Sequence, residues 1–155
     1  YLRVYTSAMT AKRIEAVLRP ASVAVVGASD TPGSIGEVLC RNLREGGFRG
    51  PVFYVNPLHA TIGDELSYPD VRSLPQTVDV AIVATPPPTL PTVLEHCGER
   101  GVRGAIIVSA GFREGGEAGA AWERSMLQVA RRYGLRLLGP NSFGVIRTDN
   151  GFNAS

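Results

Sequence analysis

Residues 22–36, SVAVVGASDTPGSIG, decide the fold of this 155-residue chain. A short β-branched run over residues 22–26 ends at Gly27 and predicts a buried strand. The loop that follows leads into a segment in which Ile35, Val38, Leu39 and Leu43 recur at helical spacing. A C-cap is expected near residues 46–47. The stretch is therefore a strand, a glycine-rich loop and a helix in direct succession.

The same alternation repeats along the chain. Further apolar runs occupy residues 51–55, 80–84, 104–108 and 135–138. Helical periodicity is seen over residues 90–97 and again in the row Trp122, Met126, Val129 and Tyr133, which we interpret as a core-facing stripe. Strands that are apolar on both faces and separated by helices predict a mostly parallel, twisted sheet with helices on both faces. The fold class expected is a Rossmann-like three-layer α/β domain.

The remaining segments are less regular. Residues 10–18 predict a short lead-in helix, whereas residues 1–7 fit either a strand or a tail. Residues 58–77 lack helical periodicity and carry turn signals at residues 63–64 and 68–70. We therefore expect a lead-in segment over residues 1–18 and one Rossmann-like domain over residues 19–155, both belonging to a larger multidomain protein.

Composition excludes several classes of protein. Sixteen Lys and Arg against fourteen Asp and Glu leave a net charge of +2, and no basic stripe is visible, so nucleic acid is not expected as a partner. No apolar run approaches the ~20 residues of a membrane helix. Cys40 and Cys97 lie far apart, without zinc-ligand spacing, and are expected to be buried, reduced thiols of a cytoplasmic protein. No metal site is expected.

Small and polar residues gather where the predicted strands end. They form residues 27–36, 56–57, 85–88, 109–111 and 139–141. In parallel sheets ligands bind at this edge, close to the point where the strand order reverses. Residues 33–36, which open the first predicted helix, offer unpaired N–H groups to an anion and are the best phosphate cradle in the chain.

Two details weigh against NAD. Five residues separate Gly27 from Gly33, whereas the dinucleotide fingerprint places a single residue between its first two glycines. The end of the second strand carries Asn56 and Pro57, where an NAD site requires a carboxylate for the ribose hydroxyls. These features favour a nucleotide whose phosphates are placed differently.

Five runs together carry a family resemblance: SVAVVGAS at 22–29, PGSIG at 32–36, YVNP at 54–57, SAGF at 109–112 and GPN at 139–141. The chain resembles, over residues 18–155, the CoA-binding domain of NDP-forming acyl-CoA synthetases, relatives of the succinyl-CoA synthetase α subunit. The closing GFNA, residues 151–154, is similar to the family's exit toward its next domain.

The resemblance implies a ligase that joins a carboxylic acid to CoA through an acyl phosphate and a phosphohistidine. Its phosphohistidine and ATP-grasp domains would lie outside this chain, since neither His59 nor His96 has a glycine-rich mobile setting. Expected partners are CoA or acyl-CoA and the other domains of the parent chain. Some relatives fuse the same module to a GNAT acetyltransferase. An NAD(P)- or nucleotide-binding domain and a stand-alone CoA sensor remain as alternatives.

The resemblance also implies a set of site residues and no catalytic ones. Residues 32–35 would meet CoA at the helix start, Asn56 and Pro57 would line its adenosine end, and Asn141 would lie nearest the thiol. In full, the expected CoA-binding residues are Pro32, Gly33, Ser34, Ile35, Asn56, Pro57, Thr85, Pro86, Ser109, Ala110, Gly111 and Asn141. Many relatives carry a Lys after the Asn-Pro pair, where this chain has Leu58, which leaves Arg72 or another basic residue to meet a phosphate.

Overall fold

The computed structural model describes residues 11–112 and 114–155. The helices are α1 (Ala11–Leu18), α2 (Ile35–Glu45), α3 (Leu90–Glu99) and α4 (Gly116–Tyr133), with short 3-10 helices η1 (Val71–Ser73) and η2 (Pro87–Thr89). The strands are β1 (Val23–Val26), β2 (Val52–Val55), β3 (Thr61–Ile62), β4 (Glu65–Tyr68), β5 (Val80–Val83), β6 (Gly104–Ile107), β7 (Arg136–Leu138), β8 (Val145–Arg147) and β9 (Phe152–Ala154).

Seven strands form the central sheet, in the order β3-β4-β2-β1-β5-β6-β7. All neighbours from β4 to β7 pair in parallel, and only β3 is antiparallel, to β4. The chain starts in the middle at β1, builds outward through β2 and β4, and then returns to β5 and builds the other half. The strand order therefore reverses between β1 and β5, and the predicted parallel α/β fold is confirmed.

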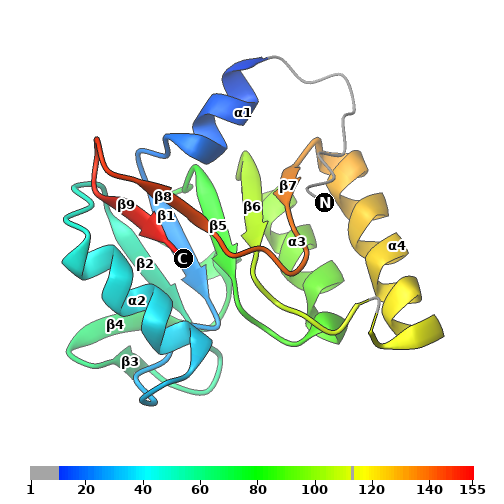
Figure 1. The fold of residues 1–155 in the computed structure, drawn as a ribbon, viewed down its shortest axis with the longest axis horizontal. Coiled ribbons are helices and arrows are strands. Elements are labelled where there is room, and N and C mark those ends of the chain that lie inside the picture. Colours follow the sequence, from blue (N-terminus) through cyan, green and yellow to red (C-terminus); the bar gives the residue numbers. More distant parts are fainter. Residues whose placement is uncertain (1–10, 113) are drawn as a thin grey trace.

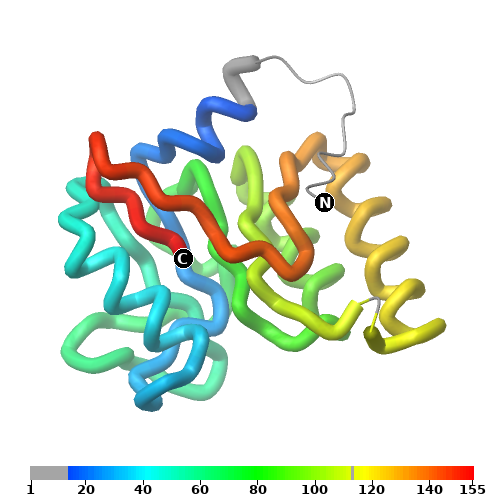
Figure 2. Tube along the Cα trace, viewed as in Figure 1, coloured from blue at the N-terminus to red at the C-terminus, as the bar shows by residue number. Residues whose placement is uncertain are grey.

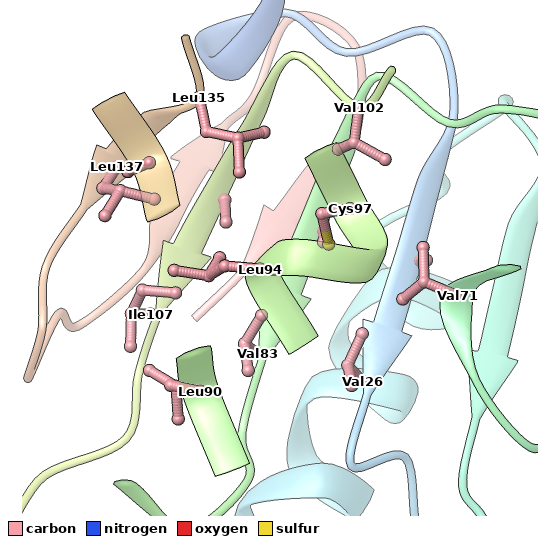
Figure 3. Packing of buried hydrophobic residues seen from close by; sticks show 14 of the residues in the cluster. Val26, Val71, Val83, Leu90, Leu94, Cys97, Val102, Ile107, Leu135 and Leu137 are labelled. Carbon is pink, nitrogen blue, oxygen red and sulfur yellow. The ribbon is translucent and has the colours of Figure 1, made fainter. Parts of the chain in front are cut away.

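The two faces of the sheet are covered by different elements (Figure 1). One face carries α2 and the small β8–β9 hairpin, and Val17 of α1 belongs to the same buried cluster. The other face carries α3, α4 and η1. Leu90 and Leu94 of α3 and Met126 of α4 are fully buried in the cluster on this face. Figure 3 shows this second cluster, in which Cys97 and Leu94 of α3 lie over Val83 and Ile107 of the sheet.

Side-chain alternation along β1 divides the core between the two faces. Val23 and Val25 join the cluster beneath α2, whereas Ala24 and Val26 join the cluster beneath α3 and α4. All four are at most 4% exposed, so neither face of this strand meets water. This is the burial expected of a central parallel strand and explains why its sequence is apolar throughout.

The region of residues 58–77 differs from a plain loop. It contains the β3–β4 hairpin, whose turn falls at the signal predicted for residues 63–64, and the 3-10 helix η1. Strands of two and four residues show too little alternation to be recognised from sequence. Ile62 is nevertheless 1% exposed, so the hairpin contributes to the core.

The last strand expected from sequence was residues 135–138, yet the chain forms a further antiparallel pair, β8–β9. Phe152 and Ala154 are fully buried, and the Phe152 ring lies 5.6 Å from that of Phe48. Asn42 of α2 donates its side-chain N–H to the carbonyl of Ser155 at 2.7 Å. The segment with the family's exit signature is therefore part of the layer beside α2.

Expectations for residues 1–7, and for Thr10 as the first residue of the lead-in helix, lie outside the described residues. Within residues 11–112 and 114–155, none of the helices combines the length and apolar character needed to cross a bilayer.

Candidate functional site

The predicted site residues lie at one edge of the sheet, in its loops and at Ile35, the first residue of α2. Parallel strands end on the same side, so the loops after β1, β2, β5, β6 and β7 line a common rim, the lower edge of the sheet in Figure 1. We call this the carboxyl edge. The rim is continuous from the loop after β2 to the loop after β7, because these strands are neighbours in the sheet.

The N-terminus of α2 faces this rim beside the point where the strand order reverses. Ser34 is the N-cap residue, and its hydroxyl oxygen accepts the backbone N–H of Glu37 at 3.2 Å. The N–H groups of Ile35 and Gly36 have no partner within the helix, because they belong to its first turn. The helix end therefore presents two amide donors and a positive dipole end to an anion.

Two glycines of this loop have opposite surroundings. A Cβ on Gly36 would lie 2.1 Å from the backbone oxygen of Gly27, so only a glycine lets α2 pack this closely on the end of β1. A Cβ on Gly33 would meet nothing within 4 Å, and the residue needs glycine because its φ is +77°. Gly36 thus holds the helix on the sheet, and Gly33 leaves the rim open.

Both polar atoms of the Asn56 side-chain amide form hydrogen bonds within the protein. Its Nδ2 donates to the carbonyl of Ala28 at 2.8 Å, and its Oδ1 accepts the N–H of Leu58 at 2.8 Å. An aspartate could accept the second bond but could not donate the first, and it would place a carboxylate against a carbonyl oxygen. The side chain that replaces the acid of an NAD site is therefore required to join the loops after β1 and β2.

The loops after β5 and β6 are joined through Ser109, which is 6% exposed. Its hydroxyl donates to the carbonyl of Thr85 at 2.6 Å. Thr89 lies 2.8 Å from the Thr85 hydroxyl, oxygen to oxygen. Pro86 and Ala110 are exposed beside them and Gly111 is half-buried. The hydroxyl groups here satisfy one another and the backbone, and no charged side chain takes part.

Asn141 lies in the loop after β7, where its φ is +53° and the preceding Gly139–Pro140 peptide is cis. Its backbone N–H donates to the carbonyl of Ser109 at 3.0 Å. The site residues predicted after β6 and β7 are therefore in direct contact through the backbone. The exposed side chain of Asn141 faces solvent at the end of the rim.

Sequence reasoning missed one contact of the rim. Asp30 in the loop after β1 accepts the N–H of Gly63 at 3.3 Å, which joins the β3–β4 hairpin turn to the site. A single exposed aspartate in a glycine-rich loop carries no signal of such a partner. Arg72, considered as a phosphate ligand, forms an ion pair with Asp70 at 3.3 Å.

Neither cysteine is suited to act as a nucleophile, because both thiols are buried. Burial raises the pKa of the Cys97 thiol to about 12 and also raises that of Cys40. Both are buried free cysteines, as the sequence predicts. Among the described residues, no three His, Cys, Asp or Glu side chains come together as a metal site.

Comparison with known proteins gives a consistent set of relatives. Residues 21–148 match the protein family described as CoA binding domain. The ADP-forming acetate–CoA ligase II of Archaeoglobus fulgidus is 45% identical over 136 residues, which cover 88% of this chain and 20% of that protein. The α subunit of the ADP-forming acetate–CoA ligase I of Pyrococcus furiosus is 42% identical over 146 residues, covering 92% of this chain and 32% of the subunit.

A solved structure agrees with this assignment. The dinucleotide-forming acetyl-coenzyme A synthetase 1 of Ca. Korarchaeum cryptofilum, in complex with phosphate and ADP, superposes with a TM-score of 0.85 at 37% sequence identity. The match covers 92% of this chain and 30% of that one. The chain spans only a fifth to a third of the relatives compared here. With its switch-point helix and its match across the whole sheet, the chain belongs to the family of CoA-binding domains found in ADP-forming acid–CoA ligases.

Proposed function

We propose that this domain holds CoA along its carboxyl edge as the CoA-binding part of an ADP-forming acid–CoA ligase. The observation that carries the proposal is the family match over residues 21–148, which includes every strand of the central sheet and all the loops of the rim. The geometry supports it independently, because the rim pairs an open helix N-terminus with loops that are rich in small residues.

The diphosphate of CoA is assigned to the start of α2. Ile35 is 58% exposed there, its amide and that of Gly36 have no partner within the helix, and the Ser34 hydroxyl, which already accepts from Glu37, still has its proton to donate. Pro32 and Gly33 are exposed and leave room for the phosphate oxygens. The positive end of the helix dipole favours the anion without a lysine or arginine in the cradle.

The adenosine end is assigned to the loop after β2. Because the Asn56 amide is occupied by Ala28 and Leu58, its contribution is to hold the two loops in register. Pro57 and Leu58 are exposed and provide an apolar surface for the base. No carboxylate is available in residues 56–58 for ribose hydroxyls, which separates this site from one for NAD.

The pantetheine arm is assigned to the loops after β5 and β6, along Thr85, Pro86 and residues 109–111. These loops follow one another across the sheet, and the arm then ends near Asn141 after β7. In this arrangement the chain binds the carrier, orients its sulfur toward the β7 side and leaves the sulfur accessible. The isolated chain is expected to bind CoA and not to turn it over.

Phosphoryl transfer is assigned to other parts of the parent protein. His96 lies on α3, on the side of the sheet opposite α2, and His59 is exposed in the loop after β2. We propose residues 19–155 as the CoA-binding unit, residues 1–18 as its lead-in segment, and a cytoplasmic parent that supplies the phosphohistidine and ATP-grasp domains.

Calorimetric titration of the chain with CoA, dephospho-CoA and NAD tests the proposal. We expect CoA to bind and to raise the melting temperature, NAD to do neither, and Ser34→Ala to weaken CoA binding. Leu18→Ala is the control, because Leu18 is exposed on α1, which precedes β1 and lies at the opposite edge of the sheet from the rim loops. NAD binding as tight as CoA binding would contradict the proposal and favour a dinucleotide domain.

Sequencing of the parent reading frame separates the ligase from two other arrangements. A phosphohistidine loop and an ATP-grasp segment are expected; a GNAT domain would indicate a protein acetyltransferase, and no further domain would indicate a CoA sensor. The ligase is favoured because the relatives compared above are named as acetate–CoA ligases or an acetyl-coenzyme A synthetase.

A further inference from the structure

Phe143 is 98% exposed, whereas Phe112 and Phe152 are 2% and 0% exposed. An aromatic ring with almost no protein contact is unusual, because it leaves a large apolar surface in water. The ring lies two residues beyond Asn141, in the loop that ends the rim. A ligand on the rim is therefore a direct candidate for covering it.

The backbone that carries Phe143 is held from both sides. The N–H of Asn141 donates to Ser109 at 3.0 Å and the N–H of Ser142 donates to Ile107 at 3.1 Å, so the loop is bound to the end of β6. The N–H of Gly144 donates to the Ser142 hydroxyl at 3.0 Å. Figure 2 shows this segment, in orange after β7, turning at the carboxyl side of the sheet before it enters β8. These hydrogen bonds therefore hold in place the loop that carries the Phe143 ring.

The length of the pantetheine arm places the sulfur of CoA at this loop. Three strand spacings separate β1 from β7 in the order β1-β5-β6-β7, which is about 14 Å at ~4.8 Å per spacing. The arm has about twelve bonds between the diphosphate and the sulfur, or roughly 14 Å at the ~1.2 Å per bond of an extended chain. With the diphosphate at the start of α2, an acyl group on the sulfur reaches the loop after β7.

We propose that Phe143 contacts the acyl group of the CoA thioester and favours apolar acyl chains. The inference rests on the proposed function, since it takes the position of the diphosphate from it. The surroundings agree: residues 80–94, 104–112 and 137–146 contain no charged side chain, so these segments offer a carboxylate on the acyl group no ion-pair partner. An apolar chain gains by covering the ring, and a charged chain does not.

The experiment is a calorimetric titration of this chain with CoA, hexanoyl-CoA and succinyl-CoA. For the wild-type chain we expect hexanoyl-CoA to bind about three- to tenfold more tightly than CoA, as the burial of a few methylene groups against a ring allows. Succinyl-CoA is expected to bind no more tightly than CoA. In Phe143→Ala the advantage of hexanoyl-CoA falls below about twofold, while the affinity for CoA itself changes by less than about twofold.

Two further variants separate the contact from a general effect. Phe143→Trp is expected to restore the preference for hexanoyl-CoA, because it retains an aromatic surface. Leu66→Ala removes another exposed apolar side chain, 59% exposed on β4 near the other end of the strand order from β7, and is expected to leave the preference unchanged. Thermal melting of each variant shows whether the fold is kept; loss of the preference counts only in variants that melt like the wild type, and Phe143→Leu replaces any that does not.

Each result has one reading. An equal affinity of the wild type for CoA and hexanoyl-CoA overturns the inference and leaves the proposed function standing, with Phe143 then available to another polypeptide. A preference that persists in Phe143→Ala also overturns it. A wild-type chain that binds none of the three ligands overturns the proposed function, and this inference with it.

Discussion

The two edges of the central sheet are held together by different chemistry. At the amino edge, where the parallel strands begin, charged side chains join the loops: Asp79 accepts the N–H of Ala21 at 2.8 Å and pairs with Arg103 at 3.5 Å. Arg100 donates to the carbonyl of Leu74 at 2.9 Å. At the carboxyl edge the loops after neighbouring strands are joined by the amide of Asn56 and the hydroxyl of Ser109, and Asp30 bonds to the β3–β4 turn.

This difference indicates which edge binds a ligand. At the amino edge Asp79, Arg100 and Arg103 each bond to another group of the protein, so these charges are used in the fold itself. The carboxyl edge joins its loops through Asn56 and Ser109, with Asp30 bonded only at the hairpin turn, and it leaves the amides at the start of α2 unpaired within the helix. The carboxyl edge is therefore the edge at which we expect a ligand that combines an anionic phosphate group with an uncharged arm.

The largest effect is expected from Gly36→Ala. The added Cβ would meet the Gly27 backbone oxygen, which cannot rotate away, so the free energy of unfolding should fall by about 3 kcal/mol and CoA binding by more than tenfold. Gly33→Ala is the matched variant: it meets no atom and should cost only about 1 kcal/mol for its positive φ. Urea denaturation and CoA titration measure both. Equal losses of stability and CoA affinity in the two variants would show that α2 does not pack closely on the end of β1.

At the opposite edge, Asp79→Ala should lower the free energy of unfolding by about 1–2 kcal/mol, because the N–H of Ala21 loses its acceptor. Its affinity for CoA should stay within about twofold of the wild type. Arg103→Ala is the control, since its side chain is 59% exposed and its ion pair contributes less than about 1 kcal/mol. A large loss of CoA affinity in Asp79→Ala would break the distinction between the edges.

The two edges also show how much of the structure can be predicted from the sequence. Periodicity over residues 22–55 and 80–138 predicts the five principal strands and the helices between them, because burial on both faces requires continuous apolar runs. It also places the small residues at the carboxyl edge. The role of each small residue is not predictable: Gly33 and Gly36 look alike in sequence, and the structure distinguishes them by the positive φ of Gly33 and the Gly27 oxygen beside Gly36.

The parts that sequence missed depend on contacts between distant segments. The β8–β9 hairpin is stabilised by burial of Phe152 beside α2, more than a hundred residues earlier in the chain. Its strands of three residues are too short to show alternation. Asn56 was predicted from the resemblance as a ligand residue, and its side-chain amide donates to the loop after β1 and accepts from Leu58 in its own loop. The assignments of individual CoA contacts stay predictions.

Between the two edges, the pH dependence of the free energy of unfolding reports on the buried thiol of Cys97. Burial raises the pKa of Cys97 to about 12 from an ordinary thiol value of 9.0. Above pH 9 the unfolded chain loses this proton while the folded chain keeps it, so the unfolded state binds fewer protons and stability falls as the pH rises. At pH 9.5 the loss is about 1 kcal/mol relative to neutral pH. Urea denaturation at pH 7.5 and 9.5 should show a smaller decrease in Cys97→Ala; an unchanged decrease would contradict it.

The smallest expected effect adds a charge to the rim. Leu58 is 85% exposed directly after Pro57, and Leu58→Lys places a cation beside the proposed adenosine end, where CoA carries its 3′-phosphate and dephospho-CoA carries none. Affinity for CoA should rise about two- to threefold at low salt, while that for dephospho-CoA stays unchanged, since an exposed pair contributes less than about 1 kcal/mol. Leu18→Lys on α1, 38% exposed, is the control for added net charge. Because salt screens exposed pairs, the gain should disappear near 1 M salt. An equal gain for both ligands, or for both variants, would mean that the adenosine end lies elsewhere on the rim.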